Sequence, residues 1–242
     1  EKSCGVSDTR SAIIKLLHRL GLEYTKPKAI GRKLNVEKQK AFIKAYNDLL
    51  NNLLDDEAVM FADGVHPTHA ARPAGFWGPT GVQFAIEQTS CSKRINIHGA
   101  IDLETGKTCI QDVLTVDSDS FIALLNDIEQ SYRRKRRIHV FVDQAAYHKS
   151  EKVRDWLSRP GCRIKLHYVP AYSPHLDPIE RLWGVMHKNV THNKTYPTLR
   201  AFANSVLDFL KREVPQNWQK YRDTITDNFR VIDPADFRVL NA

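Results

Sequence analysis

Cysteine is scarce in this sequence, and its spacing argues against one class of metal site. The 242 residues hold four cysteines, Cys4, Cys91, Cys109 and Cys162, and no two of them form a Cys-x-x-Cys pair. A zinc ribbon is typically built from such pairs, so the spacing argues against that kind of site. Scattered thiols with mostly apolar neighbours are typical of buried structural cysteines in a reducing compartment, which predicts a cytoplasmic protein.

Long apolar runs are missing as well. No stretch approaches the roughly 18–20 apolar residues that a membrane span requires, and the opening Glu-Lys-Ser-Cys-Gly has no signal-peptide apolar segment. We therefore expect no membrane partner. The sequence also starts without Met, as a fragment or a processed product would.

The composition excludes a disordered chain. Hydrophobic residues make up 42% of the sequence, charged residues 26% and aromatic residues 9%, as in an ordinary globular protein. A chain of this length can bury one sizeable core and carry a small appendage.

Acidic residues are fewer than basic ones, and the excess of basic residues is concentrated in parts of the sequence. The net charge is +8, and residues 1–50 alone carry eleven Lys or Arg against five Asp or Glu. A second basic block runs from Arg133 to Arg137 without interruption. Such concentrations favour a polyanion, because neutralising phosphates releases counterions. For either patch alone, a solvated basic surface is the alternative.

The first 34 residues are expected to form a separate basic segment. Ser7-Asp8 can cap a helix over residues 8–20, which Gly21 would end. A turn followed by a short basic helix is typical of the second half of a helix-turn-helix, but no partner helix precedes it. Residues 25–34 are expected to be a linker. We therefore predict a truncated helical DNA-binding remnant over residues 1–34 and a catalytic domain over residues 35–242.

The remaining pattern predicts an α/β domain with a mixed sheet flanked by helices, since strands come first and then alternate with helices. The expected strands are 58–62, 84–90, 94–102, 108–116, 138–142 and 164–169. The expected helices are 36–54, 118–132, 150–158, 178–190, 197–212 and 215–226.

Two of the expected strands end in an aspartate. Asp63 follows Val-Met-Phe-Ala and Asp143 follows His-Val-Phe-Val. Ligands of open α/β sheets collect at the carboxyl ends of strands, so neighbouring strands would bring both carboxylates to one edge. A single aspartate in such a place is weak evidence, because Asp also begins turns and caps helices.

A third carboxylate follows a proline-rich loop. Pro178 fits the first turn of a helix, which holds Glu180 there, with Trp183 on the same side three residues later. The plainer alternatives are that Glu180 is an acid favoured by the helix dipole and that Trp183 is a core residue.

Three clustered carboxylates repel one another, and divalent cations remove the penalty. Hard oxygen ligands favour Mg²⁺, with Mn²⁺ as a substitute. Two such ions about 4 Å apart can activate an attacking oxygen and stabilise a leaving one at a phosphodiester. We expect oxygens of Asp63, Asp143 and Glu180 within about 8 Å of one another, splayed somewhat by repulsion when no cation is bound.

Three blocks of sequence resemble a known family. FADGVHPTH, FVDQAAYHKS and YSPHLDPIERLW are similar, in order, to the signature blocks of the mariner-like superfamily of DDE transposases, most of all its bacterial insertion-sequence 630 group. The resemblance covers about residues 4–212. Thirty-six residues separate Asp143 from Glu180, which is close to the usual spacing of that family.

The resemblance implies a ribonuclease H-like fold and cleavage of double-stranded DNA at terminal inverted repeats. It also implies strand transfer into target DNA by a 3′-hydroxyl, without a covalent protein–DNA intermediate. By position, Asp63, Asp143 and Glu180 would be the catalytic residues and metal ligands, with two ions per site. A homodimer and a bacterial, nucleoid-associated location follow from the resemblance only. Gln144 departs from the pattern, since many relatives have Asn there.

Basic residues and one histidine are candidate DNA contacts, namely Arg10, Lys15, Arg19, Lys26, Lys28, Arg32, Lys33, Arg72, His148 and Lys188. A packing or capping role is the alternative for His148. His66 and His69 form a weak candidate metal pair. Two other functions stay open at this stage: a related metal-dependent nuclease without strand transfer, and a domesticated or inactive DNA-binding protein.

Overall fold

The computed structural model describes residues 9–24, 33–87 and 93–237, and the chain divides into two compact units, Glu1–Arg32 and Lys33–Ala242. The first unit contains helix α1 (Arg10–Arg19), where the Thr9 side chain accepts a hydrogen bond from the amide of Ala12. Thr9 therefore caps this helix, and the expected cap at Ser7-Asp8 lies outside the described residues. The leucines and isoleucines of α1 are all exposed, so the helix has no core of its own in the described part of the unit.

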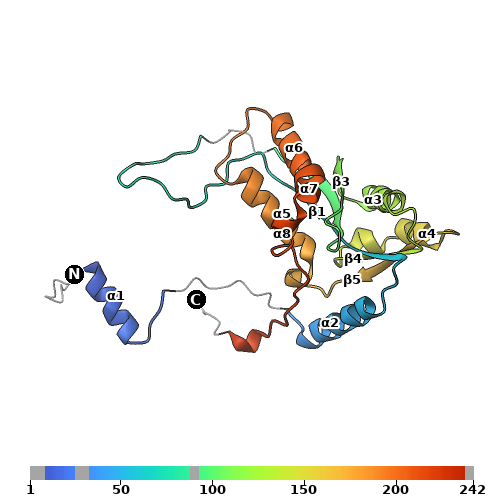
Figure 1. Ribbon diagram of the computed structural model, residues 1–242, viewed down its shortest axis with the longest axis horizontal. Coiled ribbons are helices and arrows are strands. Elements are labelled where there is room, and N and C mark those ends of the chain that lie inside the picture. The colour runs from blue at the N-terminus through green and yellow to red at the C-terminus, as the bar shows by residue number, and fades with distance from the viewer. Residues whose placement is uncertain (1–8, 25–32, 88–92, 238–242) are drawn as a thin grey trace. The chain divides into compact units, whose positions relative to one another are not determined.

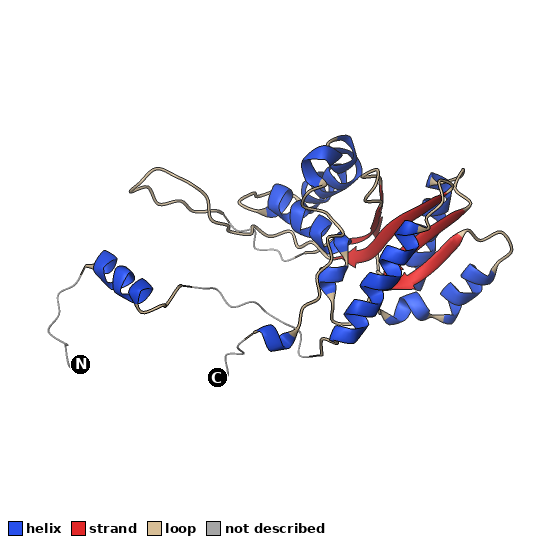
Figure 2. Ribbon diagram, turned by 60° about the horizontal axis from the view of Figure 1, so that its bottom comes forward, coloured by secondary structure: helices blue, strands red, loops and turns tan. Residues whose placement is uncertain are grey.

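The second unit is built on one mixed sheet of five strands in the order β3-β2-β1-β4-β5. The strands are β1 (Glu57–Val65), β2 (Asn96–Ile101), β3 (Thr108–Val113), β4 (Arg137–Val142) and β5 (Ile164–Tyr168). β1, β2 and β3 pair antiparallel, whereas β1, β4 and β5 pair parallel. The predicted α/β class with a mixed sheet is therefore confirmed, and Figure 2 shows the helices flanking the strands.

The helices cover both faces of this sheet, and the alternation of strand residues explains why. Successive strand residues face opposite sides. Met60 therefore packs with α3 and α4, while Phe61 packs with α2, α5 and α6. In Figure 1, α3 and α4 lie to the right of the strands and α5 and α6 to their left. These helices and the two short ones that follow are α2 (Val36–Asn51), α3 (Ser118–Ser131), α4 (Glu151–Ser158), α5 (Pro178–Met186), α6 (Leu199–Asp208), α7 (Val214–Gln216) and α8 (Trp218–Tyr221). Among the described residues, no helix is long and apolar enough to cross a bilayer.

Two expected elements are wrong. Residues 84–87 form no strand, and the rest of the expected strand at 84–90 lies outside the described residues. Phe84 instead packs edge-on against Phe76 in an exposed loop, at 4.9 Å between ring centroids. The expected helix 215–226 is two short helices interrupted at Asn217. The buried Trp218 side chain lies against Gly106, and the chain after residue 221 leaves the helical path.

Two expected helices also end early in a wider turn. α5 stops at Met186 and continues as a π-helical turn over His187–Thr191. α6 stops at Asp208 and continues as a π-helical turn over Phe209–Glu213. The apolar periodicity runs on through these turns, which is why the sequence predicted longer helices.

Candidate active site

The two aspartates follow the last paired residues of two neighbouring parallel strands, β1 and β4. Phe61 of β1 is opposite Phe141 of β4, and each aspartate follows its phenylalanine by two residues. Adjacent strands run about 5 Å apart. The sequence predicted that Asp63 ends a strand. It lies instead inside β1, where it pairs with Gly99 of β2. β1 runs on past the last residue of β4 because β2 still supports it, and the candidate site lies where β1 and β4 separate.

The Asp63 carboxylate is half-buried and held by an indole. Trp183 Nε1 donates a hydrogen bond of 3.0 Å to Asp63 Oδ2. Burial raises the pKa of Asp63, the bonds from Trp183 and the Gly64 amide oppose that rise, and the charge of Asp143 adds to it. Trp183 is a core residue, as its plainer interpretation had it, and it also contacts a predicted catalytic group.

The Asp143 carboxylate is exposed and held from the opposite side. His148 Nδ1 lies 3.0 Å from Asp143 Oδ1, which also accepts a bond of 2.9 Å from the Ala145 amide. The hydrogen bond from His148 is the main reason why the pKa of Asp143 is lowered. The His148 side chain is fully buried beside the rings of Phe121 and Tyr147. This position favours the packing alternative for His148, whose ring supports Asp143 from within the core, and its contact with DNA stays a prediction.

Glu180 is brought to this edge by the first turn of α5. The helix begins at Pro178, and the Asp177 side chain caps it by accepting a bond from the Ile179 amide. Glu180 is exposed. Burial and then the charges of Asp63 and Asp143 raise the pKa of Glu180, so this carboxylate lies within electrostatic reach of both aspartates.

Asp177 is a fourth carboxylate at the site, and the sequence reasoning missed it. It is only 4% exposed. Burial, followed by the charges of Asp63, Glu180 and Asp143, raises the pKa of Asp177 well above its usual value. The sequence could have indicated Asp177 through its position immediately before Pro178. A residue that caps the helix there lies at the same end of α5 as Glu180.

The donor chemistry of these groups fits a divalent cation. Asp63, Asp177 and Glu180 form no ion pair with Lys or Arg within the described ranges. Hard carboxylate oxygens that raise one another's pKa are suited to Mg²⁺ or Mn²⁺. Across the described residues, however, no three or more His, Cys, Asp or Glu side chains converge closely enough to hold a metal ion as they stand. That mutual repulsion splays these carboxylates when no cation is bound stays a prediction.

Three predicted DNA contacts lie on or near the elements that carry Glu180. Lys188 is exposed in the turn that follows α5. Arg72 is exposed, its backbone is bridged to His192, and its charge helps burial to lower the pKa of His187 to about 4. The ammonium of Lys33 lies 5.5 Å from the ring centroid of Tyr172, in the loop that leads to α5.

The other basic candidates belong to the first unit, and some of them are outside the described residues. Arg10, Lys15 and Arg19 are exposed on α1, in the separate first unit. Lys26, Lys28 and Arg32 lie outside the described residues. Their contact with DNA stays a prediction.

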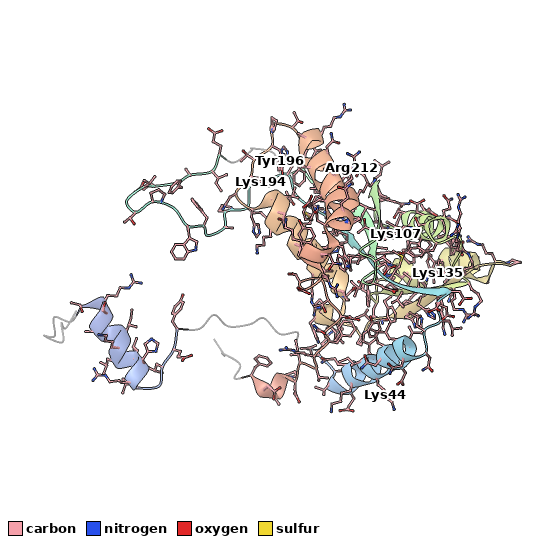
Figure 3. All side chains as sticks on the ribbon, viewed as in Figure 1. Lys44, Lys107, Lys135, Lys194, Tyr196 and Arg212 are labelled. Atoms are coloured by element: carbon pink, nitrogen blue, oxygen red, sulfur yellow. The ribbon has the colours of Figure 1, made fainter. Side chains whose placement is uncertain are left out.

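The basic block at residues 133–137 lies at the opposite end of β4 from Asp143. Arg136 forms ion pairs with Asp56 at 3.1 Å and Glu57 at 3.0 Å, and Lys135 donates to the Asp55 carbonyl. In Figure 3, Lys135 lies at the right of the sheet, away from Lys194 and Tyr196. The block is therefore no part of the carboxylate site.

His66, His69 and Gln144 each contact a different partner. His66 contacts Asn96 at 2.8 Å, whereas the buried His69 contacts the Tyr196 carbonyl at 2.9 Å. Gln144 Nε2 donates to the Val169 carbonyl at 2.7 Å, which ties the end of β4 to the segment after β5.

Comparisons with known proteins agree on one family. Residues 58–203 match the family described as DDE superfamily endonuclease. The insertion element IS630 uncharacterized 39 kDa protein of Shigella sonnei is 27% identical over 179 residues, covering 74% of this chain and 51% of that protein. The transposable element Tc3 transposase of Caenorhabditis elegans is 40% identical over 79 residues, covering 32% of this chain and 23% of that protein. The chain thus spans about half the length of the first relative and less of the second.

Solved structures share the fold. The Mos1 strand transfer complex is similar with a TM-score of 0.64 and 15% identity, over 91% of this chain and 71% of that chain. Mos1 paired-end complexes with Mn and with Mg each match with a TM-score of 0.61, at 13% and 15% identity. They cover 92% and 91% of this chain and 72% of each of those chains. The predicted ribonuclease H-like fold is therefore confirmed.

Proposed function

Because this chain belongs to the DDE superfamily endonucleases, we propose that it is a DNA transposase that cuts double-stranded DNA at transposon ends and joins those ends to target DNA. One observation carries the proposal: Asp63 lies in β1, Asp143 directly follows the neighbouring parallel strand β4, and Glu180 lies within electrostatic reach of both. The names of the Tc3 transposase and of the structurally similar Mos1 transposase support it.

We assign Asp63, Asp143 and Glu180 as the catalytic residues and metal ligands. They would hold two Mg²⁺ ions, for which Mn²⁺ substitutes, and the Mos1 complexes with Mn and Mg support that choice. Bound cations would stabilise the attacking and the leaving oxygen of the phosphodiester.

The protein's own groups would keep this geometry in place. Trp183 and His148 each fix one oxygen of an aspartate. The first turn of α5 presents Glu180 beside a helix N-terminus, whose partial positive charge favours anionic groups. In each step one phosphorus–oxygen bond forms and another breaks, first with water and then with the freed 3′-hydroxyl as the attacking group.

Binding of the substrate would use the basic surface as well as the site. We propose that residues 1–34 belong to a DNA-binding region and that residues 35–242 form the catalytic domain. Arg72 and Lys188 are exposed and are proposed to contact the phosphates of the bound end, together with the basic residues of the first segment. A homodimer would hold two ends together, and nucleoid association in the bacterial cytoplasm would follow from DNA binding.

The decisive experiment incubates the chain with DNA that carries its own element ends, in Mg²⁺, in Mn²⁺ and in EDTA. Cuts are mapped at nucleotide resolution, and a target plasmid reports joining. We expect metal-dependent cuts at the ends, followed by joined products. Cuts without joined products would favour a nuclease without strand transfer, and DNA binding without cuts in Mn²⁺ would favour an inactive DNA-binding protein.

A further inference from the structure

We propose that Trp183 is a positioning residue: its indole N–H fixes the Asp63 carboxylate and ties it to the helix that carries Glu180, and so sets the affinity of the site for divalent cations. This inference rests on the proposed function of the same carboxylates.

The position of Trp183 links two of the three carboxylates. It lies three residues after Glu180 on α5, so the two residues are one turn apart on the same side of that helix. Its side chain is only 3% exposed, and Nε1 donates to Asp63 Oδ2 at 3.0 Å. One rigid helix therefore presents one carboxylate and holds another.

The chemistry of the indole decides which atoms of Asp63 are constrained. Indole nitrogen is only a donor, so the bond engages one carboxylate oxygen and sets the rotation of the whole group. Groups that orient a metal ligand from behind change metal affinity by about 10–100-fold when they are removed. A tryptophan that only filled space would need no partner of this kind, and phenylalanine could replace it.

The opposite strand leaves room for the ring. Gly99 of β2 pairs with Asp63 in the sheet. A Cβ on Gly99 would lie 2.7 Å from Trp183 Cη2 and 2.8 Å from Ile110 Cδ1, which is too close for either contact. Glycine at this position therefore allows the indole to reach across the sheet to Asp63, and residues of three elements form the arrangement.

The same core offers a matched control. Trp218 belongs to the same hydrophobic cluster and is 8% exposed, but its ring lies against Gly106, at the turn between β2 and β3. No hydrogen bond from its indole is found among the described residues. Trp183→Phe and Trp218→Phe thus remove the same atoms from one core, but only the first removes a donor to a carboxylate.

The test is a calorimetric titration of Mn²⁺ alone into the full chain and its variants, with thermal unfolding to confirm that each is folded. We expect Trp183→Phe to weaken Mn²⁺ binding by about tenfold or more, and Trp218→Phe to leave it unchanged. Gly99→Ala keeps the indole but displaces the ring, and it should weaken Mn²⁺ binding in the same direction. In cleavage assays, Trp183→Phe should raise the Mn²⁺ concentration needed for half-maximal rate and recover most of the rate at saturating Mn²⁺.

The outcomes separate this inference from the proposed function. Wild-type affinity for Mn²⁺ in folded Trp183→Phe would overturn the positioning role and leave the metal site standing. An equal loss in Trp218→Phe would also overturn it, because the effect would then belong to the core in general. A wild-type chain that binds no Mn²⁺ would overturn the proposed function itself. If Trp183→Phe does not fold, a folded Gly99→Ala variant with wild-type Mn²⁺ affinity would overturn the role by itself.

Discussion

Asp63 and Asp143 have the same side chain in opposite surroundings. Asp63 is half-buried and has a raised pKa, whereas Asp143 is exposed and has a pKa lowered mainly by His148. The carboxylate that is easier to keep ionised is therefore the one that faces solvent. At the scale of single residues, an Asp→Asn substitution removes the charge of a side chain and keeps its shape.

Asp143→Asn is expected to abolish cleavage and leave DNA binding largely intact. Asn keeps the shape and can still accept from the Ala145 amide, but it removes the charge needed at a two-metal site. End-labelled DNA followed on denaturing gels measures cleavage, and gel shifts measure binding. The exposed Asp155→Asn is the control. Substantial nicking by a folded Asp143→Asn variant would remove Asp143 from the site.

Asp177→Asn is expected to stabilise the metal-free protein by about 1 kcal/mol. Asn caps helices as well as Asp does. It also removes a buried charge that has one capping bond of 3.4 Å and faces the charges of Asp63 and Glu180. Urea unfolding in EDTA at pH 7.5 measures the change. A clear loss of stability would mean that the ionised carboxylate is needed where it stands.

At the scale of elements, the C-terminal segment fastens α2 to the loop before Glu180. Gln39 Nε2 donates to the Ile232 carbonyl at 3.0 Å, and Gln39 Oε1 accepts from the Ile232 amide and from His175, both at 2.9 Å. Tyr46 on the same helix donates to Asp227 at 2.7 Å. The Gln39 side chain is fully buried, and it binds both the amide and the carbonyl of Ile232, as a paired strand would.

Gln39→Ala should therefore destabilise the second unit by about 2–3 kcal/mol, since three bonds are lost and buried groups are left unpaired. Chemical unfolding followed by circular dichroism gives the value. The exposed Lys40→Ala on the same helix serves as the reference. A change within about 0.5 kcal/mol, as for an ordinary surface position, would show that the C-terminal segment is not fastened this way.

The pair of histidines on β4 and β5 predicts a loss of stability in acid. His139 Nδ1 and His167 Nε2 lie 2.9 Å apart, and burial is the main cause that lowers the pKa of His167 to about 4 and that of His139 below its usual 6.5. Each histidine has a lower pKa in the folded protein than in the unfolded chain. Between its two pKa values, the unfolded chain therefore binds more protons than the folded protein. The contribution of these histidines to the free energy of unfolding is therefore fully present above pH 6.5, and it is lost as the pH drops toward 4.

We expect His167 to contribute on the order of 2 kcal/mol to that fall, less than the roughly 3 kcal/mol of a fully buried group because its ring is half-buried. His167→Gln should flatten the decline of unfolding free energy with pH. An unchanged slope in His167→Gln would refute the assignment.

At the scale of the whole molecule, charge and fold are divided between two units. Residues 1–34 carry eight Lys or Arg against three Asp or Glu, a net charge of +5 out of +8. The α2 helix keeps its cap, Asn35, when those residues are removed. Deletion of the first 34 residues therefore removes no strand of the sheet and none of the carboxylates.

Deletion of residues 1–34 should weaken DNA binding and make it less dependent on salt, with little change in sequence preference. Without these residues the chain loses +5 of its net charge of +8, whereas a lone helix is poorly positioned to read bases. For the intact chain, affinity should fall by roughly 10³-fold or more between 50 and 200 mM salt if about six phosphates are neutralised. Fluorescence anisotropy at several salt concentrations tests this. Equal affinity with an equal salt slope after deletion would contradict the prediction.

The sequence alone determined the class of the sheet and two of its strands with their aspartates. Four or five apolar residues before Asp63 and Asp143 are enough to place each backbone in a buried strand, because local periodicity reports burial. The prolines before Glu180 likewise predicted the start of α5, since a proline fits the first helical turn. These features depend on neighbours in the chain, which a sequence displays directly.

Only the tertiary structure decided how the site is supported. Asp63 lies inside β1 because β2 continues the ladder, and Trp183 reaches it because Gly99 leaves space, two facts set by pairing across more than thirty residues. His148 lies beside Asp143, and its ring is enclosed by Phe121 and Tyr147. Asp177 joins the carboxylates through the same packing of α5 on the sheet. Burial and charge at a point depend on every element that meets there, and no local pattern contains that information.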